Sequence, residues 1–293
     1  MESESRGHAA AGAEIGAPLA DGRRPWRYEG RALNGSSRPL RANGVLPAAG
    51  ERAPWVVLAV GRESPRERHQ RWCDGLAKEG YATLVFEPET DEAWWRHADA
   101  LEQLIRLIRL DATTPGLGCH GVLDAERVVL IGEGTGAAAA ARAAAELPLL
   151  DGVLFADPFG AATVLPWLTQ IAAPVAVVAT GAPQAAEAQR WHAAARNGND
   201  TRWLVTFDHE HGLPRNALPR QPILERSVRE LCTTFVSTQL PRSAAPAGSF
   251  AKLARRGPVV RTVEFVHNGA RVSLASAPDA ARDDSTELTP RDE

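Results

Sequence analysis

The chain has 293 residues, 44% of them hydrophobic, and 33 lysines and arginines against 36 aspartates and glutamates give it a formal net charge of −3. This length and apolar fraction suffice for a globular fold with a large core, and they argue against a wholly disordered chain. The basic residues are dispersed along the sequence, so we expect neither a nucleic-acid surface nor a surface for acidic lipids.

The cysteines, Cys73, Cys119 and Cys232, are odd in number and have no C-x-x-C spacing. This pattern predicts neither a disulfide framework nor a zinc site. No segment reaches the roughly 20 apolar residues of a membrane span. The first 22 residues also lack the basic and apolar regions of a secretory signal. We therefore expect a cytoplasmic protein that does not enter a membrane.

The N-terminal part of the chain changes character at about residue 25. Residues 1–24 are poor in large apolar side chains and predict a flexible arm. From Trp26, short strands separated by turns are expected, with Asn34-Gly35 as a hairpin turn. The apolar run Trp55–Val60 has the length and β-branched content of a buried strand.

From residue 55 onward, expected strands alternate with expected helices. Leu101, Leu104, Ile105 and Ile108 form an i, i+3, i+4, i+7 stripe, which is typical of an amphipathic helix. The alternation predicts an α/β protein whose central sheet is mostly parallel, with helices on both faces. Further strands are expected at 81–86, 127–131, 152–157, 174–180 and 201–207, and further helices at 72–78, 184–196 and 223–240.

The chain beyond residue 240 differs in composition. Residues 241–259 are rich in Pro, Ala, Ser and Arg, and residues 261–276 alternate apolar and polar side chains across a His-Asn-Gly turn. The alternation predicts a hairpin. The last seventeen residues resemble a solvated acidic tail. We thus divide the chain into an arm (1–24), an α/β domain (25–240) and a C-terminal extension (241–293).

The stretch VVLIGEGTGAAAAARAA, residues 128–144, combines a strand, a glycine-rich turn and a helix. Nucleophile elbows have this order, with the attacking serine at the middle of G-x-S-x-G. Here the middle residue is Gly134. The glycines have a structural interpretation too, since such a turn needs positive φ and close packing. A phosphate cradle is disfavoured because Glu133 would repel the anion and Ala139 replaces the third glycine of the dinucleotide fingerprint.

Four segments together resemble the α/β-hydrolase fold, in the branch of dienelactone hydrolases, chlorophyllases and cutinases. They are VVLAVGRESPRERHQRW, GYATLVFEPET, RVVLIGEGTG and WLVTFDHEHGLPRN, and the resemblance covers residues 26–240. It implies a small acyl or ester ligand, no cofactor and no metal. The neighbouring His209 and His211 could also be taken for metal ligands, but a solvated loop is the simpler interpretation.

The resemblance assigns roles to particular positions. It places the oxyanion-hole backbone N–H groups at Gly61 and Arg62 and at Thr135, and the general-base histidine at His211. The usual acid position, after residues 174–180, holds no carboxylate before Glu187. Asp157, at the end of the preceding strand, is the substitute that some lipases of this fold use.

Glycine has no atom that could attack a carbonyl, and covalent catalysis requires one beside its base. We therefore expect a pseudo-hydrolase with a binding or scaffolding role. The alternative is a carboxylic ester or lactone hydrolase with a rearranged site, in which His211 with Asp157 or Glu133 activates water, or Ser64 or Thr135 attacks. A third interpretation is a partner-binding module that acts through residues 241–293.

Overall fold

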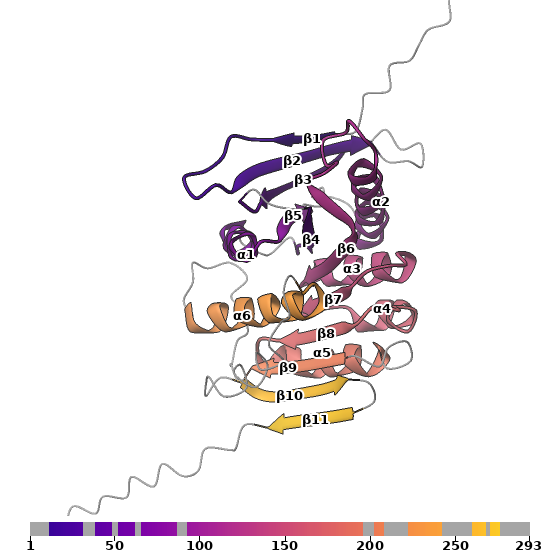
Figure 1. The fold of residues 1–293 in the computed structure, drawn as a ribbon. Coiled ribbons are helices and arrows are strands. Elements are labelled where there is room, and N and C mark those ends of the chain that lie inside the picture. Colours follow the sequence, from indigo (N-terminus) through magenta and orange to yellow (C-terminus); the bar gives the residue numbers. More distant parts are fainter. Residues whose placement is uncertain are drawn as a thin grey trace, which may run out of the picture.

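The computed structural model describes residues 12–31, 39–48, 52–61, 66–86, 93–195, 202–207, 222–241, 260–267 and 270–275. They form an eleven-stranded sheet in the order β1-β2-β3-β5-β4-β6-β7-β8-β9-β10-β11 (Figure 1). The strands are β1 (Gly12–Ile15), β2 (Arg24–Arg31), β3 (Pro39–Leu46), β4 (Ala53–Ala59), β5 (Ala82–Phe86), β6 (Leu123–Glu133), β7 (Gly152–Ala156), β8 (Val175–Ala179), β9 (Arg202–Phe207), β10 (Val260–His267) and β11 (Ala270–Ala275).

The central six strands, β4 to β9, pair in parallel, while β1 to β3 and β10 with β11 add antiparallel edges. Every residue of β4, β5, β7 and β8 is buried, as expected for parallel strands covered on both faces. The predicted α/β class with a parallel central sheet is confirmed. The helices are α1 (Arg66–Lys78), α2 (Trp94–Thr113), α3 (Thr135–Glu146), α4 (Ala161–Leu168), α5 (Ala182–Ala194) and α6 (Pro222–Gln239).

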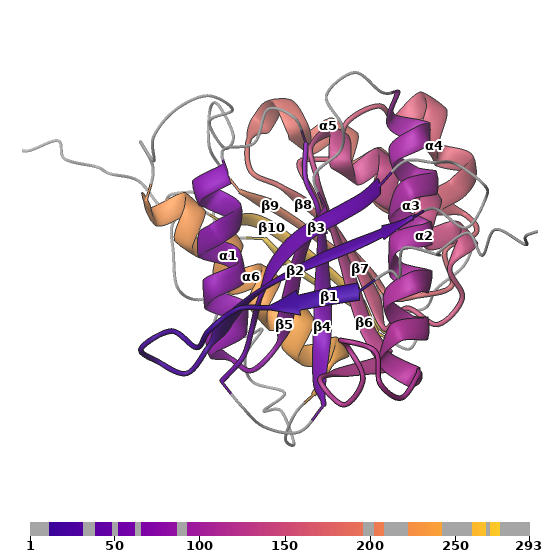
Figure 2. The same cartoon turned by 90° about the horizontal axis from the view of Figure 1, so that it is seen from above.

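Helices α1 and α6 cover one face of the sheet, and α2, α3, α4 and α5 cover the other (Figure 2). Each face has its own apolar core. On the first, Trp203 packs edge-on against Phe235, with ring centroids 4.8 Å apart. On the second, Phe155 packs against Trp191 at 5.0 Å. No helix in the described part of the chain is long and apolar enough to cross a bilayer.

The structure differs from the sequence expectations at both ends of the sheet. Strand β1 lies within the segment expected as a flexible arm, where it pairs antiparallel with β2. The predicted C-terminal hairpin is present as β10 and β11, and β10 pairs with β9. The hairpin therefore continues the main sheet, because β9 would otherwise offer an open edge. The Asn34-Gly35 turn lies outside the described residues, although β2 and β3 on either side pair antiparallel.

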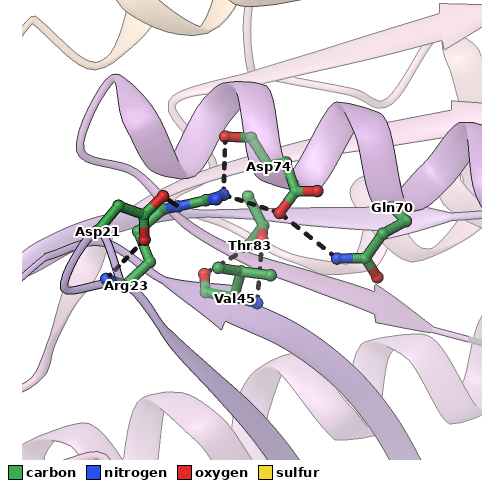
Figure 3. A network of polar contacts seen from close by, with 6 residues as sticks. All are labelled: Asp21, Arg23, Val45, Gln70, Asp74 and Thr83. Atoms are coloured by element: carbon green, nitrogen blue, oxygen red, sulfur yellow. Dashed lines mark hydrogen bonds and ion pairs between the residues drawn. The ribbon is translucent and has the colours of Figure 1, made fainter. Parts of the chain in front are cut away.

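A polar network ties the N-terminal strands to α1 (Figure 3). Arg23 donates from Nε to Asp21 and from Nη1 to Asp74 of α1, each at 2.7 Å. The Thr83 hydroxyl lies 3.2 Å from both the backbone N and the backbone O of Val45, and so joins β5 to β3. Helix α1 is therefore held at the end of the sheet that carries β1 to β3.

Candidate active site

The turn between β6 and α3 has a backbone conformation that favours glycine. Gly134 has φ 57° and ψ −123°, a combination that L side chains rarely adopt. Its N–H donates to the Ala156 carbonyl of β7 at 3.0 Å, and its carbonyl accepts from the Ala137 N–H at 3.2 Å. Gly134 thus lies at a sharp strand-to-helix turn and carries no side chain there.

The two flanking glycines are required by close packing. A Cβ on Gly136 would lie 2.3 Å from the Ala59 carbonyl oxygen of β4, and one on Gly132 would lie 2.6 Å from the Ala137 Cα. Real Cβ atoms do not approach other atoms this closely. The first turn of α3 therefore lies directly against the carboxyl end of β4.

This packing brings two of the predicted oxyanion-hole segments to the same edge of the sheet. Gly61 is buried and follows the end of β4, while Thr135 is half-buried and is the first residue of α3. The N–H groups of a first helical turn have no partner within the helix and point outward from its end. Arg62, the other predicted oxyanion residue, lies outside the described residues.

Asp157 lies at the carboxyl end of β7, also at this edge, and has φ 46°. Its carboxylate accepts the backbone N–H of Thr180 at 2.7 Å and the hydroxyl of the same residue. Thr180 follows β8, so the carboxylate is directed toward the neighbouring strand. The predicted base His211, together with His209 and Ser64, lies outside the described residues.

The usual acid position is helical in this chain. Residues 182–184 form the start of α5, with Gly181 as its N-cap. Glu187 lies one turn further along, where it accepts a hydrogen bond from the Trp191 indole at 3.3 Å and forms an ion pair with Arg190. Glu187 is thus engaged within its own helix.

Glu133, which precedes Gly134, is buried and paired. Its Oε2 lies 2.9 Å from Nε2 of His69 in α1, and both side chains are about one-twentieth exposed. The donor and acceptor roles in this contact depend on the tautomer of the histidine. Cys232 of α6 is close enough that the Glu133 charge, after burial, contributes to raising the pKa of its thiol.

Sequence reasoning considered Glu133 only as a charge that would repel phosphate and, in the hydrolase alternative, as a residue that activates water with His211; it did not single out His69. A signal for His69 was present, since His69, Trp72, Cys73 and Leu76 recur at helical spacing on the buried side of α1. No spacing rule links position 69 to position 133, which lie 64 residues apart.

Metal binding has no support from the described residues, among which no three His, Cys, Asp or Glu side chains are grouped as ligands. All three cysteines are free and buried.

Helix α3 presents small alanine side chains to the sheet, and eight residues of this helix are buried.

Among the comparisons with known proteins, only the one with solved structures gives matches. No family model matches the sequence, and no curated protein matches it significantly. Among solved structures, 612 chains match, including the dienelactone hydrolase from Anabaena variabilis ATCC 29413. The TM-score with that enzyme is 0.57 at 20% sequence identity, and the match covers 74% of this chain and 99% of that chain. This chain therefore has the α/β-hydrolase fold.

Proposed function

We propose that this protein is a pseudo-hydrolase, which uses the α/β-hydrolase scaffold to bind a small acyl or ester ligand without forming an acyl-enzyme. The observation that carries the proposal is the glycine at the sharp turn between β6 and α3, where the resemblance expects the nucleophile. Covalent catalysis requires a nucleophilic atom at this point, and glycine supplies none. Without its serine, such a site retains at most the catalysis that comes from binding and oxyanion stabilisation.

The rest of the edge supports binding more than turnover. Asp157 is engaged by Thr180 of the neighbouring strand, and the usual acid position is the start of a helix. Gly61 and Thr135 are main-chain donors, so they would serve a bound carbonyl or carboxylate as readily as a transition state.

A cytoplasmic location belongs to the same proposal. Three free, buried thiols and no disulfide among the described residues suit a reducing compartment.

The test compares labelling by a fluorophosphonate probe with hydrolysis of short p-nitrophenyl esters. Wild-type protein should neither label nor turn over, and G134S should do both, because the serine would occupy an elbow already in position. The matched control is G116S, which introduces a serine at another positive-φ glycine, φ 88°, whose Cβ position has nothing within 4 Å. G116S should stay unlabelled.

Two further results decide the alternatives. Labelling of the wild type would overturn the proposal, and peptide mapping would then identify the real nucleophile, with Ser64 and Thr135 as the residues to inspect first. In the G134S background, H211A should abolish turnover if His211 occupies the position of the base. Failure of G134S to label would show that the retained elbow does not align with a base.

A further inference from the structure

The Glu133–His69 pair lies directly behind the elbow, on the side of the sheet covered by α1 and α6. The two side chains are 5% and 6% exposed, and their polar atoms are 2.9 Å apart. They come from the last residue of β6 and from the first turns of α1. Gly134, the elbow apex, is the next residue after Glu133.

Stability alone does not account for a buried pair of this kind. Removing a carboxylate and an imidazole from water is costly, and apolar side chains of similar volume are often at least as stabilising. The face of the sheet on which the pair lies has an apolar core that includes Leu154, Val228 and Phe235. We therefore look for the role of this polar pair in the backbone positions that it fixes.

That geometry follows from the order of the elements. Strand β4 ends at Ala59, Gly61 follows, and α1 begins at Arg66, so His69 lies just beyond the segment that links β4 to α1. On the opposite side of the elbow, Gly136 packs against Ala59. The chain on either side of Gly61 is thus held to the elbow at two points, through Ala59 before it and through His69 after it.

We propose that the Glu133–His69 pair is a positioning device, which fixes the Gly61 segment relative to the elbow and thereby sets the spacing of the two main-chain donors, Gly61 and Thr135. The pair does not touch the ligand in this account. It acts through the backbone on either side of it. The inference rests on the proposed function, because it concerns the edge of the sheet at which that function places ligand binding.

Amide hydrogen exchange on the full chain tests the proposal without any ligand. H69L removes the contact between His69 and Glu133, and we expect exchange in peptides covering 58–61 and 133–138 to become about tenfold faster or more, because local opening is set by the contacts of that unit. H69Q keeps an N–H donor in place of Nε2 and should retain most of the protection. The control D74N lies in the same helix, loses the ion pair with Arg23 and should leave both peptides unchanged.

The double variant H69L/E133L separates positioning from the simple cost of a buried charge. Replacing both partners by leucine should recover the urea midpoint lost in H69L, since no carboxylate is then left without its imidazole. Under our proposal, exchange at the elbow and at 58–61 stays fast in this variant. Recovery of both the midpoint and the local protection would overturn the proposal, as would equal acceleration by D74N. If H69L does not fold, E133Q and the double variant provide the same comparison.

A second test uses the G134S variant, in which a serine replaces the glycine of the turn. In the G134S background, H69L should slow fluorophosphonate labelling by about tenfold or more, which is less than the roughly 10²–10³-fold effect of removing an oxyanion-hole donor outright, because H69L only displaces the donors; H69Q should largely restore labelling. Unchanged labelling would contradict the proposal. If G134S itself does not label, the proposed function loses support, while the exchange experiment still decides the role of the pair.

Discussion

Three glycine-to-alanine substitutions separate backbone strain from crowding at the elbow. Gly134 has a positive φ, Gly136 is helical but lies against β4, and Gly116 has φ 88° with open space around its Cβ position. G116A thus measures backbone strain alone. G136A measures close packing alone, and G134A measures the conformation of the apex.

The expected magnitudes follow from these positions. An L residue in the left-handed region costs about 1–2 kcal/mol, which we expect for G116A. At Gly134 the ψ of −123° lies outside the left-handed helical well, so G134A should cost about 2 kcal/mol, within the range for rare backbone conformations. G136A places a Cβ 2.3 Å from the Ala59 oxygen, and the backbone of α3 or β4 must move. Its cost should be about 3 kcal/mol, at the upper end for overpacking, although alanine favours the helix by about 1 kcal/mol.

Urea unfolding followed by tryptophan fluorescence measures all three variants. At equal m-values, the midpoints should fall in the order G116A, G134A, G136A, with G136A lowest. A G136A midpoint at or above that of G116A would refute the close approach of α3 to β4. If the urea midpoint of G134A equals that of the wild type, the backbone at Gly134 does not disfavour an L residue. The structural basis for placing a serine there in G134S is then lost.

Three more substitutions test the surroundings. Burial raises the pKa of Asp111, so ionisation of this carboxyl opposes folding above the unfolded value near 3.8. D111N should therefore match wild-type stability at pH 3 and exceed it at pH 7. Urea midpoints at both pH values measure this, and a difference in stability that does not change with pH would contradict it. T180V removes the hydroxyl bond to Asp157 and should lower the free energy of unfolding by about 1.5–3 kcal/mol, whereas T180S should not. F155A empties a fully buried site against Trp191 and should cost about 3–5 kcal/mol in the same assay; a loss below 1 kcal/mol would contradict the packing.

The fold was predictable because its signals are local. The stripe from Leu101 to Ile108 places one face of α2 in the core, and the apolar runs that became β4, β7 and β8 are continuous because parallel strands are buried on both faces. The edges were harder to predict. Gly12–Ile15 has little apolar character, and it becomes a strand because β2 offers it hydrogen-bonding partners.

The candidate site also combines features that local sequence predicts with features that only the packing of distant elements brings together. The elbow is contiguous in sequence, and its glycine spacing was enough to predict a sharp strand-to-helix turn. Asp157 and Thr180 each end a parallel strand, so their meeting follows from the topology once β7 and β8 are neighbours. His69 meets Glu133 only through the packing of α1 on the sheet, which no local pattern records.

The glycine at the apex also changes the energetic balance of the fold. An elbow with serine holds an L residue in a conformation that costs about 1–3 kcal/mol, and the surrounding contacts must impose that strain. Gly134 adopts the same φ and ψ without a Cβ, so the turn keeps its shape with less strain. The contacts that impose the elbow, Gly136 against β4 and the Gly134 N–H on Ala156, are nevertheless present. Under the proposed function, the chain keeps the geometry of the elbow without the stability cost of a nucleophile held in a strained conformation, in line with the general trade-off between stability and activity.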